Sequence, residues 1–186
     1  MRVGTGLSDA HDSAAGAAEA ARAAAQALDG AEVDLALVFA SGAHLADPEK
    51  MLAAVHAELA PTALVGCGAG GVLGQGRELE GGTGVAVWAA ALQGGEARSF
   101  HATVRRQDDV GVLDGMPEIG SDAAVIILSD PYSFPTDAVL DGIADAAPGV
   151  PVLGGLSSAR SPLGDAALFA DARVVHDGAV GVCLNG

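Results

Sequence analysis

Basic residues are scarce in this sequence of 186 residues. It contains nine lysines and arginines against 24 aspartates and glutamates, and its formal net charge is −15. The acidic residues are spread along the chain without a long run. Nucleic-acid binding needs a concentrated basic patch, so this charge balance argues against DNA or RNA as a partner. A net charge of this size is typical of a soluble protein.

Long apolar segments and aromatic residues are also scarce. No run approaches the roughly 18 apolar residues of a membrane-spanning helix, and the N-terminus lacks the apolar region of a signal peptide. We therefore expect a cytoplasmic protein without a membrane partner. Aromatic residues make up 3% of the chain although 50% of it is hydrophobic, so the core must consist mainly of Val, Leu, Ile and Ala.

Cysteine and histidine occur too rarely to suggest a disulfide framework or a metal site. The two cysteines, Cys67 and Cys183, are expected to be reduced, and Cys183 lies in an apolar strand typical of a core. The five histidines show no metal-ligand spacing. His101 and His176 each lie on a predicted strand near a turn, where either could ligate a haem iron alone. A solvated or hydrogen-bonded histidine is the commoner case.

The most informative feature of the sequence is a match between its first and second halves. The glycine-rich residues 66–71 have a counterpart at residues 154–159, 88 positions later, and residues 34–41 align with residues 122–129 at the same offset without a gap. Large apolar residues between these segments recur at i, i+1, i+4 and i+8 in both places, which is one face of a helix. Only two copies are present, so we infer a duplication about a pseudo-twofold axis rather than a solenoid.

The offset between the matching residues changes from 88 to 96 after the glycine-rich segments, where residues 77–83 align with residues 173–179. Eight residues are therefore inserted in the second copy. We predict a single domain over residues 1–186, with internal repeats at about residues 1–95 and 96–186.

The hydrophobic pattern predicts an α/β fold, namely a mixed β-sheet with flanking helices built from two tandem β-α-β-β-β repeats. In the first copy we predict strands at 2–7, 33–40, 62–65, 77–80 and 83–92, a helix to about 28 capped by Ser8 or Asp9, and a helix from Asp47–Pro48 to Pro61. In the second copy we predict strands at 96–105, 123–129 and 151–155 and a helix at 136–147, with a polar link at 106–120. Tight hairpin turns are predicted at Gly81–Gly82 and Asp177–Gly178.

The first glycine-rich segment admits several interpretations. Gly66, Gly68 and Gly71 satisfy the G-x-G-x-x-G pattern of dinucleotide-binding loops. That pattern needs a helix N-terminus to receive the pyrophosphate, and residues 72–76 do not resemble a helix start. Glycines also let backbone N–H groups face a small polar or anionic ligand. The alternative is that they serve only close packing and tight turns.

We expect a ligand site at the carboxyl ends of the strands, where α/β proteins place their ligands. Both glycine-rich segments leave strands at such ends, and so do residues 41–44 and residues 130–132. Two copies that face each other would bring these four segments to one crevice. Cys67, in a Gly-Cys-Gly setting, also suits a nucleophile on a sharp turn, with His44 as the candidate base.

Several of these segments resemble the FIST sensory domain. Residues 65–72, with the sequence VGCGAGGV, and residues 76–87 look like the first signature of that family. Residues 151–158 and residues 176–182 look like its second signature. The resemblance covers essentially the whole chain and corresponds to the N-terminal FIST domain. One departure is Gly68, which stands where loops of the family often carry a serine.

The resemblance implies a ligand-sensing module that binds small molecules such as amino acids and stands beside bacterial signalling domains. A C-terminal partner domain is usual in that family and is not present in this sequence, so we expect the chain to continue in a longer parent protein. Some relatives are described as haem-binding nitric-oxide sensors. The family has no settled catalytic residues, so none is transferred to this chain.

We predict a non-enzymatic sensory domain of a signal-transduction protein, with an amino acid or another small polar metabolite as its ligand. A FIST C-terminal domain or a signalling output domain is the expected protein partner, and no cofactor is expected. The alternatives are a haem-binding gas sensor, a thiol-dependent hydrolase using Cys67, and a purely structural or partner-docking module. The candidate ligand-binding residues are Ser41, Gly66, Cys67, Gly68, Ala69, Arg77, Asp130, Tyr132, Gly155, Leu156, Ser157 and Ser158.

Overall fold

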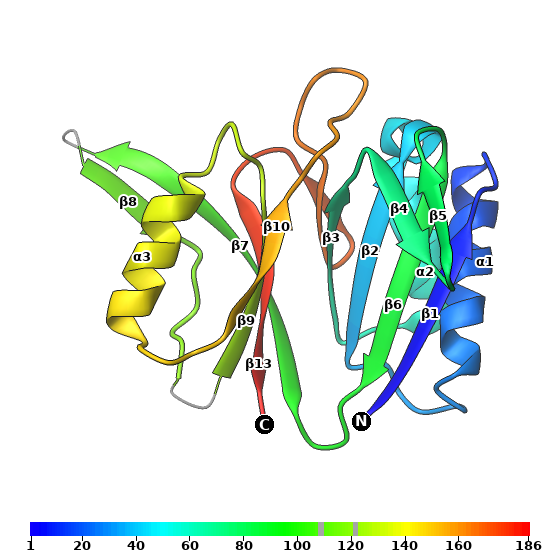
Figure 1. The fold of residues 1–186 in the computed structure, drawn as a ribbon, viewed down its shortest axis with the longest axis horizontal. Coiled ribbons are helices and arrows are strands. Elements are labelled where there is room, and N and C mark those ends of the chain that lie inside the picture. Colours follow the sequence, from blue (N-terminus) through cyan, green and yellow to red (C-terminus); the bar gives the residue numbers. More distant parts are fainter. Residues whose placement is uncertain (108–109, 121–122) are drawn as a thin grey trace.

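The structure, a computed structural model, describes residues 1–107, 110–120 and 123–186. It is a mixed α/β fold, as the sequence predicts, but its strands form two main sheets and a separate hairpin instead of one mixed sheet. The two main sheets lie side by side at the centre, with helices on both outer sides (Figure 1). None of the helices in the described part of the chain is long and apolar enough to cross a membrane.

The first sheet takes most of its strands from the first half of the chain. Their order is β1 (Arg2–Ser8), β6 (Gly84–Ala91), β2 (Leu35–Ser41), β3 (Ala63–Gly68), β11 (Leu168–Ala170) and β12 (Arg173–Val175). β2 and β3 are parallel, as the strand, helix, strand pattern predicts. β6 runs antiparallel between β1 and β2.

The second sheet has the order β10 (Val152–Leu156), β9 (Ala123–Ser129), β13 (Ala179–Asn185), β7 (Glu96–Gln107) and β8 (Val110–Asp114). β9 and β10 are parallel, and β13 runs antiparallel between β9 and β7. The arrangement of β7, β13, β9 and β10 is therefore the same as that of β1, β6, β2 and β3 in the first sheet.

The helices of the described residues are α1 (Ser13–Gln26), the 3-10 helix η1 (Gly42–Ala46), α2 (Pro48–Leu59) and α3 (Thr136–Ala146). The inner face of α1 is mostly alanine, which lets it lie close to β1. An added Cβ at Gly4 or Gly6 would come within 1.9 Å of a carbonyl oxygen of α1. Asp12, and not Ser8 or Asp9, caps α1, because its side chain accepts a hydrogen bond from an N–H of the first turn.

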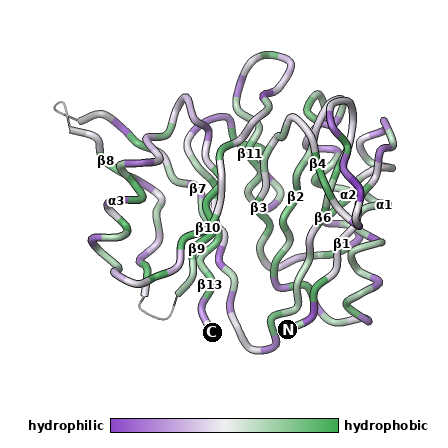
Figure 2. Tube along the Cα trace, in the orientation of Figure 1, coloured by the Kyte–Doolittle hydropathy of each residue, from purple (hydrophilic) through white to green (hydrophobic). Residues whose placement is uncertain are grey.

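The alternation of side chains along the strands divides the core into layers. On β2, Val38 and the other even-numbered side chains pack under α1 and α2, whereas the odd-numbered Leu35 faces the second sheet. On the far side of the second sheet, Phe100 and Ile127 pack under α3. Hydrophobic residues accordingly concentrate in the central strands of both sheets (Figure 2).

The two predicted hairpins, at Gly81–Gly82 and at Asp177–Gly178, are wrong in the same way. β5 (Arg77–Glu80) pairs with β4 (Gly71–Gly74), and β6 pairs with β1 and β2. Likewise, β12 pairs with β11, and β13 pairs with β7 and β9. All three glycines have the positive φ that such turns need. The strand after each turn nevertheless pairs with strands other than the one before it.

The link predicted at residues 106–120 is not wholly irregular. It contains β8, which pairs with β7, and an ion pair joins Arg105 to Asp114 there. Asp108 and Asp109 of this link, and Asp122 at the start of the second-copy match, lie outside the described residues. The remaining predicted strands and helices agree with the structure to within a few residues.

The glycine-rich segments begin as extended strand and not as loops, because β3 continues to Gly68 and β10 to Leu156. An added Cβ at Gly66 would lie 1.9 Å from the carbonyl oxygen of Val38, and one at Gly154 would lie 1.8 Å from that of Ile127. Each of these glycines pairs with that residue on the neighbouring parallel strand. Close strand packing therefore explains both glycines. By contrast, an added Cβ at Gly155 meets nothing within 4 Å.

We expect Gly154→Ala to destabilise the protein by about 3 kcal/mol, because its Cβ would overlap a backbone oxygen that side-chain motion cannot relieve. The adjacent Gly155→Ala is the matched control, and it should change the free energy of unfolding by less than about 1 kcal/mol. Urea unfolding of both variants, followed by circular dichroism, measures the two values. Equal losses would contradict the packing explanation.

Candidate functional site

The two glycine-rich segments lie next to each other and are joined by three hydrogen bonds. Ser157 Oγ donates to the carbonyl oxygen of Gly68 at 3.0 Å, and the N–H of Ala159 donates to the same oxygen at 3.3 Å. The N–H of Gly70 donates to Ser158 Oγ at 3.0 Å, across 88 positions of sequence. The two halves of the chain therefore meet at these segments.

A cleft of about 440 Å³ opens beside this junction. Its lining is mainly apolar, and both halves of the chain contribute to it. The lining residues are Leu37 and Phe39 of β2, Cys67 and Gly68 of β3, Ala69, Ile126 and Leu128 of β9, Leu153, Gly154, Gly155 and Leu156 of β10, and Ser158. The cleft can therefore hold the apolar part of a small molecule, with a hydroxyl and exposed backbone at its margin.

Each sheet contributes a bulky and a small residue at paired positions. Phe39 pairs with Cys67 in the first sheet, and Leu128 pairs with Gly155 in the second. The small member of each pair leaves space that a larger side chain would fill. The volume of the cleft thus depends on Cys67 and Gly155 remaining small.

The nucleophile hypothesis requires Cys67 to be exposed on a turn. The structure instead buries Cys67 within β3. Burial raises the pKa of its thiol to about 12, and a hydrogen bond with Ser157 opposes that shift only in part. Such a thiol is almost entirely protonated at neutral pH, whereas the thiolate is the reactive form. The site therefore does not favour nucleophilic catalysis by Cys67.

His44, the candidate base, is fully buried beside the start of α1, where its Nδ1 lies 3.4 Å from Ser13 Oγ. Burial, and to a lesser extent the charge of His11, lowers the pKa of His44 and favours the neutral ring. Within the described part of the chain, no hydrogen bond joins His44 to Cys67. The nucleophile and base pair of a thiol hydrolase is therefore not assembled.

Asp130 and Tyr132 belong to a polar cluster after β9 that also contains Arg160. Asp130 is buried, accepts a hydrogen bond from Ser133 Oγ at 2.7 Å, and lies 3.6 Å from the Arg160 guanidinium. That guanidinium stacks over the ring of Tyr132, 4.7 Å from its centroid. Arg160 was not predicted from the sequence, because it lies in the region of the second-copy insertion, where the internal match offers no counterpart.

Half of the predicted ligand-binding residues do not line the cleft, namely Ser41, Gly66, Arg77, Asp130, Tyr132 and Ser157. Ser41 is buried, and its hydroxyl donates to a backbone oxygen of β6 at 3.4 Å. Arg77 pairs with Asp9 at 3.3 Å and lines another cavity, of about 800 Å³, between the β4–β5 hairpin and the first sheet. This cavity shares three lining residues with the cleft, so the two adjoin.

The apolar lining residues of β2 and β9 were missed by the sequence analysis. They are Leu37, Phe39, Ile126 and Leu128. Both strands are nearly continuous apolar runs, so the pattern does not reveal which face lies under helices and which faces a cavity. The internal match could have indicated these residues, because it aligns β2 with β9.

The candidate metal and haem ligands do not gather at the cleft. Within residues 1–107, 110–120 and 123–186, no three or more His, Cys, Asp or Glu side chains form a group that could hold a metal ion. His101 Nε2 lies 2.9 Å from the carbonyl oxygen of Asp177, and His176 Nδ1 lies 3.0 Å from that of Ala166. Neither histidine lines the cleft.

The G-x-G-x-x-G pattern lacks the context of a dinucleotide site. Its last glycine, Gly71, begins β4, so a strand follows where the pyrophosphate of a dinucleotide would need a helix N-terminus. The prediction that residues 72–76 do not start a helix is confirmed.

Comparison with known proteins gives one family match and several relatives. The family model described as the FIST N domain matches residues 34–186. An uncharacterized protein of Mycobacterium tuberculosis (strain CDC 1551 / Oshkosh) is 37% identical over 187 residues, and an uncharacterized protein of Mycobacterium bovis (strain ATCC BAA-935 / AF2122/97) is 34% identical over 188 residues. Each match covers 100% of this chain and 48% of the relative. The chain thus spans about half the length of the curated relatives it matches.

We expect Cys67 to react slowly with thiol reagents in the folded protein. With a pKa of about 12, its thiolate fraction at pH 8 is roughly a thousandfold below that of an ordinary cysteine. Folded and urea-unfolded protein are treated with iodoacetamide at pH 8, and labelling of Cys67 is followed by mass spectrometry. Similar labelling rates in the two states would show that the thiol is neither buried nor shifted.

Proposed function

Because this chain belongs to the FIST N domain family, we propose that it is a sensory domain that binds a small molecule in the cleft between its two glycine-rich segments. FIST domains are generally sensory, and the family match is the observation that carries the proposal. The position of the cleft supports it, because both segments contribute to the lining. We assign the protein partner or output domain to the part of the longer relatives that this chain does not match.

The lining of the cleft guides the choice of ligand. Leu37, Phe39 and Leu128 suit an apolar group. Ser158 Oγ accepts a hydrogen bond from the N–H of Gly70, which leaves its hydroxyl hydrogen to donate to a ligand. No charged residue is among those that line the cleft, so a ligand with a large net charge fits it poorly. We therefore propose an amino acid with an apolar side chain, or a small metabolite of similar shape.

We also propose that the two sheets arose by internal duplication. The matching arrangement of β1, β6, β2, β3 and of β7, β13, β9, β10 supports this. So do the two close contacts, of Gly66 with Val38 and of Gly154 with Ile127. These contacts match β3 with β10 at a sequence offset of 88 residues and β2 with β9 at an offset of 89 residues. The structural match thus differs by one residue from the gapless alignment of the sequences.

Duplication makes the cleft a pseudo-symmetric site. Matching β2 to β9 at 89 positions relates Leu37 to Ile126 and Phe39 to Leu128, and all four residues line the cleft. Each half therefore contributes the same face of its central strand. A ligand held in the cleft contacts both halves of the chain at once. Ligand binding can therefore be coupled to the relative position of the two halves.

A non-enzymatic role is part of this proposal. The raised pKa of Cys67 and the separate environment of His44 argue against the thiol hydrolase. His101 and His176 both lie outside the cleft, so neither supplies a ligand to a haem iron placed there. Ligand binding without turnover is the function that these residues support best.

A calorimetric screen of amino acids and small organic acids tests ligand binding. A ligand present at 100 times its dissociation constant adds about 2.7 kcal/mol to the free energy of unfolding. For a chain of this size that corresponds to a rise in Tm of about 5–10 °C. We expect amino acids with apolar side chains to raise the Tm. The absence of a shift with every compound would overturn the proposal.

Gly155→Val is the diagnostic variant for the cleft. Its side chain meets no protein atom near the added Cβ, and it occupies the space beside Leu128, so the variant should fold normally and lose the ligand-induced shift in Tm. Gly120→Val is the matched control, because Gly120 also has nothing within 4 Å of an added Cβ but lies outside the cleft. Loss of the shift in both variants, or in neither, would rule out the cleft as the binding site.

A further inference from the structure

β10 forms one edge of the second sheet and, in the described part of the chain, pairs only with β9. Its side chains are apolar and yet exposed, with Leu153 64% exposed and Leu156 54% exposed. An exposed apolar strand at a sheet edge is a template for pairing with another strand. This edge is therefore a candidate docking surface.

The backbone groups of β10 alternate between β9 and the open side. The N–H of Ser157 and the carbonyl oxygen of Pro151 both bond to β9, at 2.8 and 2.9 Å. In a strand, residues two apart direct their N–H and C=O groups to the same neighbour. The backbone N–H and C=O groups of the odd-numbered residues of β10 therefore point towards β9. The N–H and C=O groups of Val152, Gly154 and Leu156 therefore point away from the sheet.

β3 holds the corresponding place in the first sheet, and its open side is filled. β11 pairs antiparallel with it, and the N–H of Gly68 donates to the carbonyl oxygen of Ala167 at 2.7 Å. The β11–β12 hairpin belongs to the connection between β10 and β13. The connection between β3 and β6 forms the β4–β5 hairpin, which packs near the first sheet and stays separate from β10. β10 thus lacks the kind of hairpin that covers β3.

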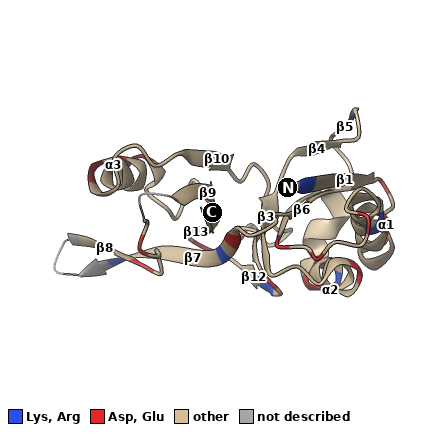
Figure 3. Ribbon diagram, turned by 90° about the horizontal axis from the view of Figure 1, so that it is seen from below, with Lys and Arg blue, Asp and Glu red and all other residues tan. Residues whose placement is uncertain are grey.

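Charge distinguishes β10 from the other edges of the two sheets. The edge strands β1, β12 and β8 contain Arg2, Arg173 and Asp114. Charged residues on an edge strand hinder pairing with further strands. β10 has the sequence Val-Leu-Gly-Gly-Leu, with no charged residue, and is tan along its length in Figure 3. It therefore carries none of the protection found on the other edges.

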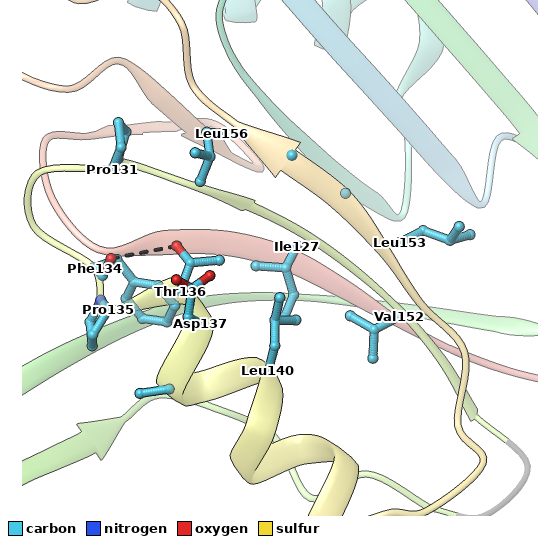
Figure 4. Close-up of a pocket in the computed structure, with 13 residues that line it drawn as sticks. Ile127, Pro131, Phe134, Pro135, Thr136, Asp137, Leu140, Val152, Leu153 and Leu156 are labelled. Atoms are coloured by element: carbon cyan, nitrogen blue, oxygen red, sulfur yellow. Dashed lines mark hydrogen bonds between the residues drawn. The ribbon is translucent and has the colours of Figure 1, made fainter.

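A mainly apolar cavity, whose lining also includes Thr136 and Asp137, continues from β10 towards α3. It has a volume of about 730 Å³ and lies between α3 and the face of β10 that carries Val152 and Leu156 (Figure 4). Leu140 of α3 and Ile127 of β9 point into the same space, whereas Leu153 points away from it. A strand added to β10 places every second side chain over this cavity.

We propose that β10 is a docking edge for a β-strand supplied by the part of the longer relatives that this chain does not match. This chain covers 48% of those relatives, so a polypeptide of similar length accompanies the matched half. The added strand runs antiparallel to β10, as β11 does to β3, and its alternate apolar side chains cover the cavity beside α3. A second copy of this chain is a poorer occupant, because two chains of net charge −15 repel each other. The proposal does not depend on ligand binding in the cleft.

Amide hydrogen exchange compares this chain with the full-length Mycobacterium tuberculosis relative. In this chain the amides of Val152, Gly154 and Leu156 exchange within about tenfold of the unstructured rate, because no strand covers them. In the relative, the amides at the matching positions exchange at least about 100-fold more slowly. Equally fast exchange in both proteins overturns the proposal.

A pair of substitutions at the position matching Leu156 in the full-length relative tests the backbone contact. Proline there removes an N–H that points away from β9, so the pairing with β9 is retained. The amides at the positions matching Val152 and Gly154 should then exchange at the rate seen in this chain. Alanine is the control, because it keeps that N–H and the protection. Slow exchange that survives the proline substitution overturns the proposal. So does a dimer of this chain with protected β10 amides in sedimentation, because a second copy is then the occupant.

Discussion

The junction between residues 68–70 and residues 157–159 is the contact on which the site depends. Two hydrogen bonds end on the carbonyl oxygen of Gly68, and an added Cβ at that residue would lie 2.8 Å from the carbonyl oxygen of Ala159. The lack of a Cβ at Gly68 permits this approach, and the hydroxyls of Ser157 and Ser158 bridge the two segments. The same approach brings β10 beside the first sheet, and the cleft lies where these strands meet.

The local pattern of the sequence was sufficient to predict most elements but not their partners. The buried runs of β2 and β9 and the helix start at Pro48 follow from hydrophobicity and proline geometry, and all three were predicted. Both hairpin predictions failed because turn chemistry fixes only the backbone at Gly81–Gly82 and Gly178. Whether the next strand pairs with its predecessor or with a distant strand is decided by burial across the whole sheet.

The site could be predicted only in part for a related reason. The glycine-rich segments stand out by composition, and the internal match pointed to both of them. Phe39 and Leu128 did not stand out, because an apolar strand has the same sequence pattern whether its second face meets a helix or a cavity. Arg160 belongs to the inserted region, where the internal match offers no guide. Arg77 was also predicted as a ligand-binding residue, but it lines the adjoining cavity and forms an ion pair with Asp9.

The position of Trp88 has an optical consequence. It is the only tryptophan of the sequence, and it lies half-buried on β6 in the wall of the cavity that adjoins the cleft. The emission of an indole ring depends on the polarity of its surroundings. Tryptophan fluorescence therefore comes from a single ring in the wall of this cavity, and it reports the arrival of a molecule there or a displacement of the β4–β5 hairpin without an added label.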